Sequence, residues 1–235
     1  MKSKYILIAA IVAALTLSSC VVTEDLTINN ANGGTSSAAI HVEDFFVDVL
    51  EDFSDFSTND SSKPIMDQSM EAFEKQLINA STTDNINLVK TGNNSYVISF
   101  DYSNLKTLLF DLGAENNQTV LNLNKNRLNF YLNLANYSNL TAVIPFLKDP
   151  NFEPFGPIYN EGLSAPDYLE MISFMLGEEG PGAIQESAIT LRFETPAPIK
   201  SFTGGKKISD NVFEYSFPLI DFLLLAEPLS FELNW

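Results

Sequence analysis

Cysteine and histidine are almost absent: Cys20 and His41 are the sole representatives of these types among 235 residues. Zinc, haem and iron–sulfur sites usually draw several such ligands from the chain, so we expect no cofactor and no metal. A single imidazole can still act as a general base. However, His41 falls in a predicted strand and no Gly-x-Ser-x-Gly nucleophile motif accompanies it. A structural role for His41 is therefore favoured.

Basic residues are also scarce, with 13 Lys and Arg against 30 Asp and Glu and a net charge of −17. Proteins bind nucleic acid largely by neutralising phosphates with basic side chains, so nucleic acid is excluded as a main partner. Binding to anionic lipid through a cluster of basic residues is disfavoured for the same reason. The acids are spread along the chain, which is typical of a solvated surface, although a cation site or a basic partner remains an alternative.

Motifs for nucleotides and calcium are missing. The glycine-rich stretches at 33–34, 177–182 and 204–205 lack the spacing of phosphate-binding loops, and the twelve-residue calcium loop does not occur. The scattered carboxylates could still include a glycosidase pair, whose acids lie about 5 to 9.5 Å apart. A carboxylate-based hydrolase acting on envelope polysaccharide is therefore an open alternative.

The N-terminus has the three parts of an export signal. Lys2 and Lys4 are followed by an apolar run from Tyr5 to Leu15 and then by small residues in front of Cys20. The run is too short for a membrane-spanning helix, which needs about 20 predominantly apolar residues. We therefore expect residues 1–19 to be a signal peptide.

The stretch Leu17-Ser18-Ser19-Cys20 resembles the lipobox of bacterial lipoproteins, in which lipid is attached to the cysteine and the peptide is cut just before it. This predicts cleavage between Ser19 and Cys20 and a membrane anchor on Cys20, because each buried acyl methylene contributes about 0.8 kcal/mol. The alternative is an ordinary signal peptide cut near a lone cysteine. Val21 stands where enteric lipoproteins retained at the inner membrane have aspartate, which favours the outer membrane.

The expected mature chain has 235 − 19 = 216 residues, with 13 − 2 = 11 basic and 30 acidic side chains. This length can bury a substantial core. We divide the chain into the signal peptide at 1–19, a lipidated N-terminus with the start of a first hairpin at 20–34, and a single envelope domain at 35–235.

Hydrophobic periodicity predicts an α+β fold with a mainly antiparallel sheet. Alternating strands flank the polar turns at 32–34, 92–94, 125–126 and 204–207. Helical spacing of apolar residues occurs at 43–56, 64–80, 105–112, 139–147 and 165–176. The stretch 177–182 is expected to be a flexible break.

The tetrapeptide Tyr-Ser-Asn-Leu occurs twice, at 102–105 and at 137–140. Because Ser and Asn can cap a helix, each copy is expected to mark a strand-to-helix junction packed on a common core. Chance recurrence of common capping residues is the alternative.

Four prolines between 145 and 157 interrupt any regular element in a stretch that is rich in aromatic residues. The loop carries Phe146, Phe152, Phe155 and, just beyond it, Tyr159. It is the best candidate in the sequence for contact with a protein, lipid or glycan partner. The alternative is a packed crossover on the surface of the fold.

Both ends of the chain resemble bacterial lipoproteins with an LppM-type domain. At the front, Asp25-Leu26-Thr27-Ile28 and the turn Asn32-Gly33-Gly34 are similar to the opening hairpin of such domains. At the back, the strand at 189–193, the prolines at 196 and 198 and the closing strand at 228–235 look like the family's ending. Residues 57–186 show no match, and no glycine directly follows Pro196 or Pro198. The resemblance implies a membrane-anchored α+β envelope protein and transfers no functional residue.

The sequence thus favours a non-enzymatic, membrane-anchored envelope lipoprotein with a binding role near the membrane surface. The hydrolase is one alternative. A structural or assembly subunit is the other.

Overall fold

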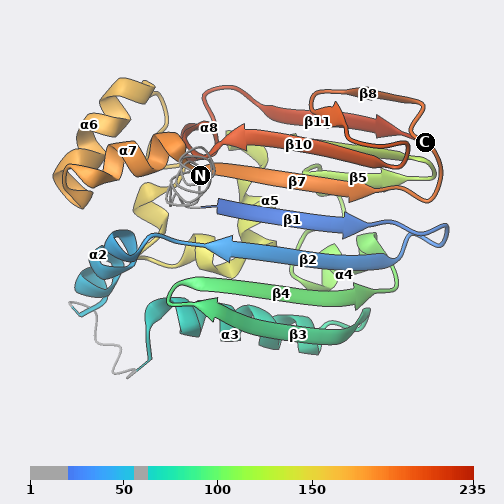
Figure 1. Cartoon of the computed structure of the whole chain (residues 1–235), viewed down its shortest axis with the longest axis horizontal. Coiled ribbons are helices and arrows are strands. Elements are labelled where there is room, and N and C mark those ends of the chain that lie inside the picture. The colour runs from blue at the N-terminus through green and yellow to red at the C-terminus, as the bar shows by residue number, and fades with distance from the viewer. Residues whose placement is uncertain (1–20, 56–62) are drawn as a thin grey trace, which may run out of the picture.

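A computed structural model of the chain describes residues 21–55 and 63–235. In this part of the chain seven α-helices accompany two β-sheets, so the predicted α+β class is confirmed. Neighbouring strands are antiparallel except for β1 and β7, which run parallel. Figure 1 shows the larger sheet face-on, with most of the helices behind it.

The larger sheet has seven strands and contains the first strand of the described chain. In spatial order the strands are β3 (Thr83–Gly92), β4 (Ser95–Tyr102), β2 (Gly34–His41), β1 (Val21–Thr27), β7 (Ala188–Glu194), β10 (Val212–Pro218) and β9 (Lys206–Lys207). The first strand of the described chain therefore lies in the middle of the sheet rather than at its edge.

The smaller sheet covers part of the inner face of the larger one. Its strands are β5 (Leu121–Asn124), β6 (Arg127–Leu132), β11 (Leu229–Asn234) and β8 (Ser201–Thr203). Phe231 of β11 packs between the sheets, with ring centroids 5.0 Å from Phe193, 5.2 Å from Phe213 and 5.5 Å from Phe130. Burial of these large apolar rings is the main stabilising contribution at this interface.

The helices pack at the back and at one end of the larger sheet (Figure 1). They are α2 (Asp44–Asp55), α3 (Ile65–Asn79), α4 (Leu105–Asp111), α5 (Tyr137–Val143), α6 (Ala165–Leu176), α7 (Glu179–Glu186) and α8 (Leu219–Leu224). None of them, within the described residues, is long and apolar enough to cross a membrane.

The first hairpin forms as its turn residues predict. The Asn29 side chain accepts hydrogen bonds from the amides of Ala31 and Gly33, at 2.8 and 3.1 Å, and Asn32 adopts a positive φ of 64°. A Cβ on Gly34 would lie 1.8 Å from the carbonyl oxygen of Thr27, so only glycine fits there. The turn sets the register that places Val21 opposite His41.

The expected flexible break at 177–182 is wrong, because α7 already begins at Glu179. Pro181 lies in the first turn of α7, where backbone N–H groups have no partner inside the helix, so its missing donor costs little. Gly180 is needed for close packing on α6, since a Cβ there would lie 2.7 Å from Cβ of Leu176. Gly180 therefore serves a helix–helix contact, and Pro181 is compatible with the first turn of α7.

The repeated tetrapeptide does not mark two equivalent junctions. Asn104 of the first copy caps α4 by accepting a bond from the amide of Thr107 at 3.0 Å. The second copy lies inside α5, which begins at Tyr137, and the preceding turn is capped by Asn133 instead. Both tyrosines, Tyr102 and Tyr137, are nevertheless buried in the core.

Candidate functional site

The predicted lipid attachment point lies directly beside the fold. Ser19 and Cys20 are outside the described residues, and β1 begins at the next residue, Val21. Val21 pairs with His41 on one side and with Ala188 on the other. No linker therefore separates Cys20 from the sheet.

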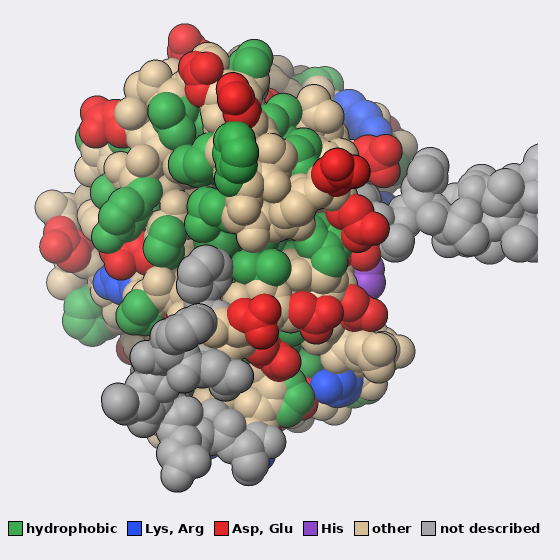
Figure 2. All heavy atoms as spheres, turned by 90° about the vertical axis from the view of Figure 1, so that its left-hand side faces the viewer, with side chains coloured by type: hydrophobic (Ala, Val, Ile, Leu, Met, Phe, Trp, Pro, Cys, Tyr) green, Lys and Arg blue, Asp and Glu red, His purple; other side chains and the backbone are tan. Residues whose placement is uncertain are grey.

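Three helices gather at the same end of the sheet. α2 begins at Asp44, shortly after His41, and α7 ends at Glu186, just before Ala188. α6 packs on α7 and contacts α2. We call the start of β1 together with α2, α6 and α7 the Val21 end, which faces the viewer in Figure 2.

The predicted aromatic loop lies against the Val21 end, and its inner part joins the core. The ring of Phe155 is buried and contacts Phe46 of α2 edge-on at a centroid distance of 5.2 Å. The ring centroid of Phe152 lies 6.2 Å from that of Phe46 and 5.3 Å from that of Phe146. Phe152 and Phe155 therefore attach the loop to α2, and Phe146 packs on Phe152. The loop contains short 3₁₀ turns at Pro145–Lys148 and Glu153–Phe155.

The outer part of the loop is exposed. Tyr159 is 62% exposed and its neighbour Ile158 is 52% exposed. The next residue, Asn160, is buried, and its side-chain amide donates to the carbonyls of Phe155 and Leu223 at 2.9 and 3.0 Å. Asn160 thus holds the loop to α8 and presents the pair Ile158 and Tyr159 to solvent, a role that no sequence motif indicated.

A shallow hollow of about 400 Å³ opens beside the loop. Its lining includes Tyr137 of α5 and the loop residues Lys148, Glu153 and Ile158. Burial, with a smaller effect of the nearby Glu153 carboxylate, raises the pKa of Tyr137 to about 12. The phenol therefore stays neutral at ordinary pH. The lining of the hollow combines the basic Lys148 and the acidic Glu153 with hydroxyl-bearing and apolar side chains.

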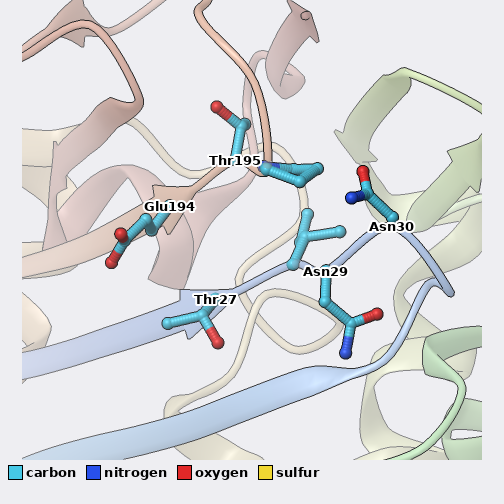
Figure 3. Close-up of a pocket in the computed structure, with 7 residues that line it drawn as sticks. Thr27, Asn29, Asn30, Glu194 and Thr195 are labelled. Carbon is cyan, nitrogen blue, oxygen red and sulfur yellow. The ribbon is translucent and has the colours of Figure 1, made fainter.

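A second hollow, of about 310 Å³, lies at the opposite end of β1 and β7 (Figure 3). Its polar side chains largely hold the surrounding turns. Thr27 accepts a bond from the amide of Thr35 at 2.8 Å, Asn29 caps the first hairpin, and the Thr195 hydroxyl donates to Ala197 at 2.8 Å. We therefore interpret this hollow as a gap left between the turns and not as a binding site.

His41 lies on the exposed face of the larger sheet. Its Nδ1 is 2.8 Å from the Ser95 hydroxyl on β4, and its Nε2 is 3.8 Å from a Glu43 carboxylate oxygen. A serine nucleophile is activated when hydroxyl, imidazole and carboxylate are joined by successive hydrogen bonds, and 3.8 Å is too long for the second of these. This arrangement gives His41 a cross-strand partner and supports a structural role.

Glu24 is a partly buried carboxyl that sequence reasoning missed. It sits on β1, on the same inward face as Leu26, and accepts a 2.6 Å bond from the hydroxyl of buried Ser36. Burial raises its pKa to about 7, the neighbouring Asp25 adds to this increase, and the Ser36 bond opposes it. Alternation along the strand placed this position inside, but an acid there does not fit a hydrophobic pattern.

In the described part of the chain, acidic residues do not gather into a metal site. In residues 21–55 and 63–235 there is no group of three or more His, Cys, Asp or Glu side chains placed to hold a metal ion. The carboxylates of the Val21 end are instead distributed around exposed apolar side chains (Figure 2).

Comparisons with known proteins identify no family for this chain. No protein-family model matches it, and no curated protein matches it significantly. Among solved structures, it is similar to the NMR structure of the folded domain of LppM from Mycobacterium tuberculosis, with 10% identity, a TM-score of 0.38, and coverage of 92% of this chain and 88% of that one. The structural resemblance to the LppM domain is weak.

Proposed function

We propose that this chain is a lipid-anchored lipoprotein of the bacterial cell envelope, held by acyl chains on Cys20 and located at the outer membrane. The observation that carries the proposal is the lipobox-like stretch Leu17-Ser18-Ser19-Cys20, which follows an export signal and contains the chain's single cysteine.

The anchor is tested by mass spectrometry of protein extracted from envelopes, combined with membrane fractionation. The native chain should begin at a Cys20 that carries acyl chains, and the Cys20→Ala variant should leave the membrane fraction. Ser19→Ala is the matched control, since alanine is also small and should preserve cleavage and lipidation. An unlipidated native N-terminus would overturn the proposal, and separate fractionation of inner and outer membranes tests the location.

We further propose that the domain binds a protein, lipid or glycan near the membrane through the outer part of the aromatic loop. Ile158 and Tyr159 are exposed next to a hollow, whereas the other large apolar side chains of their neighbourhood are buried or half-buried. Exposed apolar residues beside a concave surface are a common feature of contact sites.

A photo-crosslinking amino acid at Tyr159 tests this binding role in living cells. We expect an adduct from position 159 that is missing when the same amino acid replaces Tyr131, which is 44% exposed on β6 of the smaller sheet. Identical adducts from both positions, or none from position 159, would contradict the loop as the contact.

A further inference from the structure

Phe174 is the most exposed large hydrophobic residue in the described part of the chain, at 83%. It lies on the outward face of α6, one turn after Glu170, while Tyr168, Ile172 and Leu176 form the buried face. Phenylalanine has no polar group to satisfy in water, so an exposed ring on a helix face that already has a complete core contact indicates another apolar environment.

The position of Phe174 relative to Cys20 identifies that environment. α6 belongs to the Val21 end, and Val21 directly follows Cys20. One residue of extended chain spans at most about 3.6 Å, and a helix with its side chains is about 10 to 12 Å across. A lipid on Cys20 therefore keeps the Val21 end within reach of the bilayer surface.

We propose that the Val21 end rests on the bilayer that holds Cys20, with Phe174 inserted among zwitterionic phospholipid headgroups. This proposal rests on the lipid anchor of the proposed function. Partly exposed Met171 and Met175 lie beside Phe174 on α6 and extend the apolar surface. Aromatic and apolar side chains on a surface helix are the usual means of such shallow insertion.

The charge of the Val21 end selects the kind of lipid. Its exposed acidic side chains come from α2, α6, α7 and the residue before α7: Asp44, Asp48, Asp52, Asp167, Glu170, Glu178, Glu179 and Glu186. Figure 2 shows acidic side chains around the apolar ones on this end. Anionic headgroups would repel this surface, so zwitterionic phospholipid is the expected partner.

Site-specific fluorescence tests the contact on the full lipidated chain. Because lipid occupies the Cys20 thiol, a thiol-reactive, polarity-sensitive dye will label an introduced cysteine alone. We place the dye at Glu170→Cys, on the face of Phe174, and at Asp210→Cys, next to β10 at the opposite end of the sheet. Both proteins are reconstituted in phosphatidylcholine vesicles with or without a nitroxide-labelled lipid.

We expect the dye at position 170 to show a blue-shifted emission and to be quenched by the nitroxide lipid, and the dye at position 210 to behave as in water. Adding Phe174→Ser should lower the equilibrium constant for insertion of the Val21 end by roughly tenfold, because burying one phenylalanine contributes about 1.5 kcal/mol or more. Phe110→Ser, which removes a 53% exposed ring on α4, is the control and should change nothing. Replacing part of the phosphatidylcholine by phosphatidylglycerol should reduce quenching.

The outcomes separate this inference from the anchor. If the protein floats with the vesicles but the dye at position 170 remains in water, the anchor stands and the inserted surface is refuted. If the protein does not float, the anchor fails and the inference fails with it. A blue shift at position 170 that depends on protein concentration and not on nitroxide lipid would show contact with a second copy, and would also refute the membrane contact.

Discussion

Glu24 should make the stability of the domain decrease as pH rises. Its carboxyl lies on the inward face of a central strand, where loss of solvent raises the pKa from 4.5 to about 7. The folded state therefore binds this proton more tightly than the unfolded state. Between these two pKa values the folded protein carries more protons, so the free energy of unfolding falls with increasing pH.

The magnitude follows from the difference between the two pKa values. A shift of one pKa unit corresponds to about 1.36 kcal/mol, so an increase from 4.5 to about 7 corresponds to about 3 kcal/mol. This contribution is fully present below pH 4.5 and is lost above pH 7. Because domains of this size are stable by only about 5 to 15 kcal/mol, the loss should be easy to measure.

Urea unfolding of residues 20–235 with Cys20→Ala, between pH 4.5 and 8.5, tests this prediction. Glu24→Gln keeps the shape of the side chain and cannot ionise. The variant and the parent should be similarly stable at pH 4.5, and the variant should be more stable by about 3 kcal/mol at pH 8.5. Glu194→Gln, at an exposed site on β7, controls for general charge effects. A stability difference for Glu24→Gln that does not grow with pH would refute the argument.

Three further pairs of variants test the packing around the candidate site. Phe155→Ala should lower stability by about 3 to 5 kcal/mol in urea unfolding because it removes a buried ring, whereas Tyr159→Ala should change it by less than about 0.5 kcal/mol; equal effects would contradict the division of the loop into inner and outer parts. Asn160→Ala should cost about 2 kcal/mol or more in the same assay, since it leaves two carbonyls without their donor, and Asn151→Ala on the same loop should cost less; a neutral Asn160→Ala would show that the loop is held in another way. Gly180→Ala should lower the melting temperature through overlap with Leu176, while Gly182→Ala, with open space around it in α7, should raise it; the opposite order would argue against α7 as described.

Elements with strong local signals were predicted well. The helix expected at 165–176 is observed over Ala165–Leu176, where Ser164 accepts a bond from the amide of Asp167 as an N-cap. The strand expected at 95–102 is observed as β4, with alternating buried residues. Periodicity and capping act within one turn or one strand, so they can be interpreted from neighbouring residues alone.

Predictions that depended on distant partners failed or were missing. The helix α7 was expected to be a flexible break, because the reason for Gly180 is the close approach of α6. Phe174 lies outside the buried face of its helix, which consists of Tyr168, Ile172 and Leu176. Its significance appears only when α6 is seen at the same end of the larger sheet as the start of β1 (Figure 1).

By itself, the sequence determined the acidic charge, the scarcity of cysteine and histidine and the positions of most helices and strands, because these follow from composition and from contacts between near neighbours. Tertiary structure alone decided that β1 pairs in parallel with β7, more than 160 residues later in the chain, and that Asn160 holds the aromatic loop to α8. It also decided that Glu24 is partly buried on the inward face of β1 and that Phe174 lies at the end of the sheet where β1 begins. These features arise from long-range packing, which depends on all the elements together and has no local pattern.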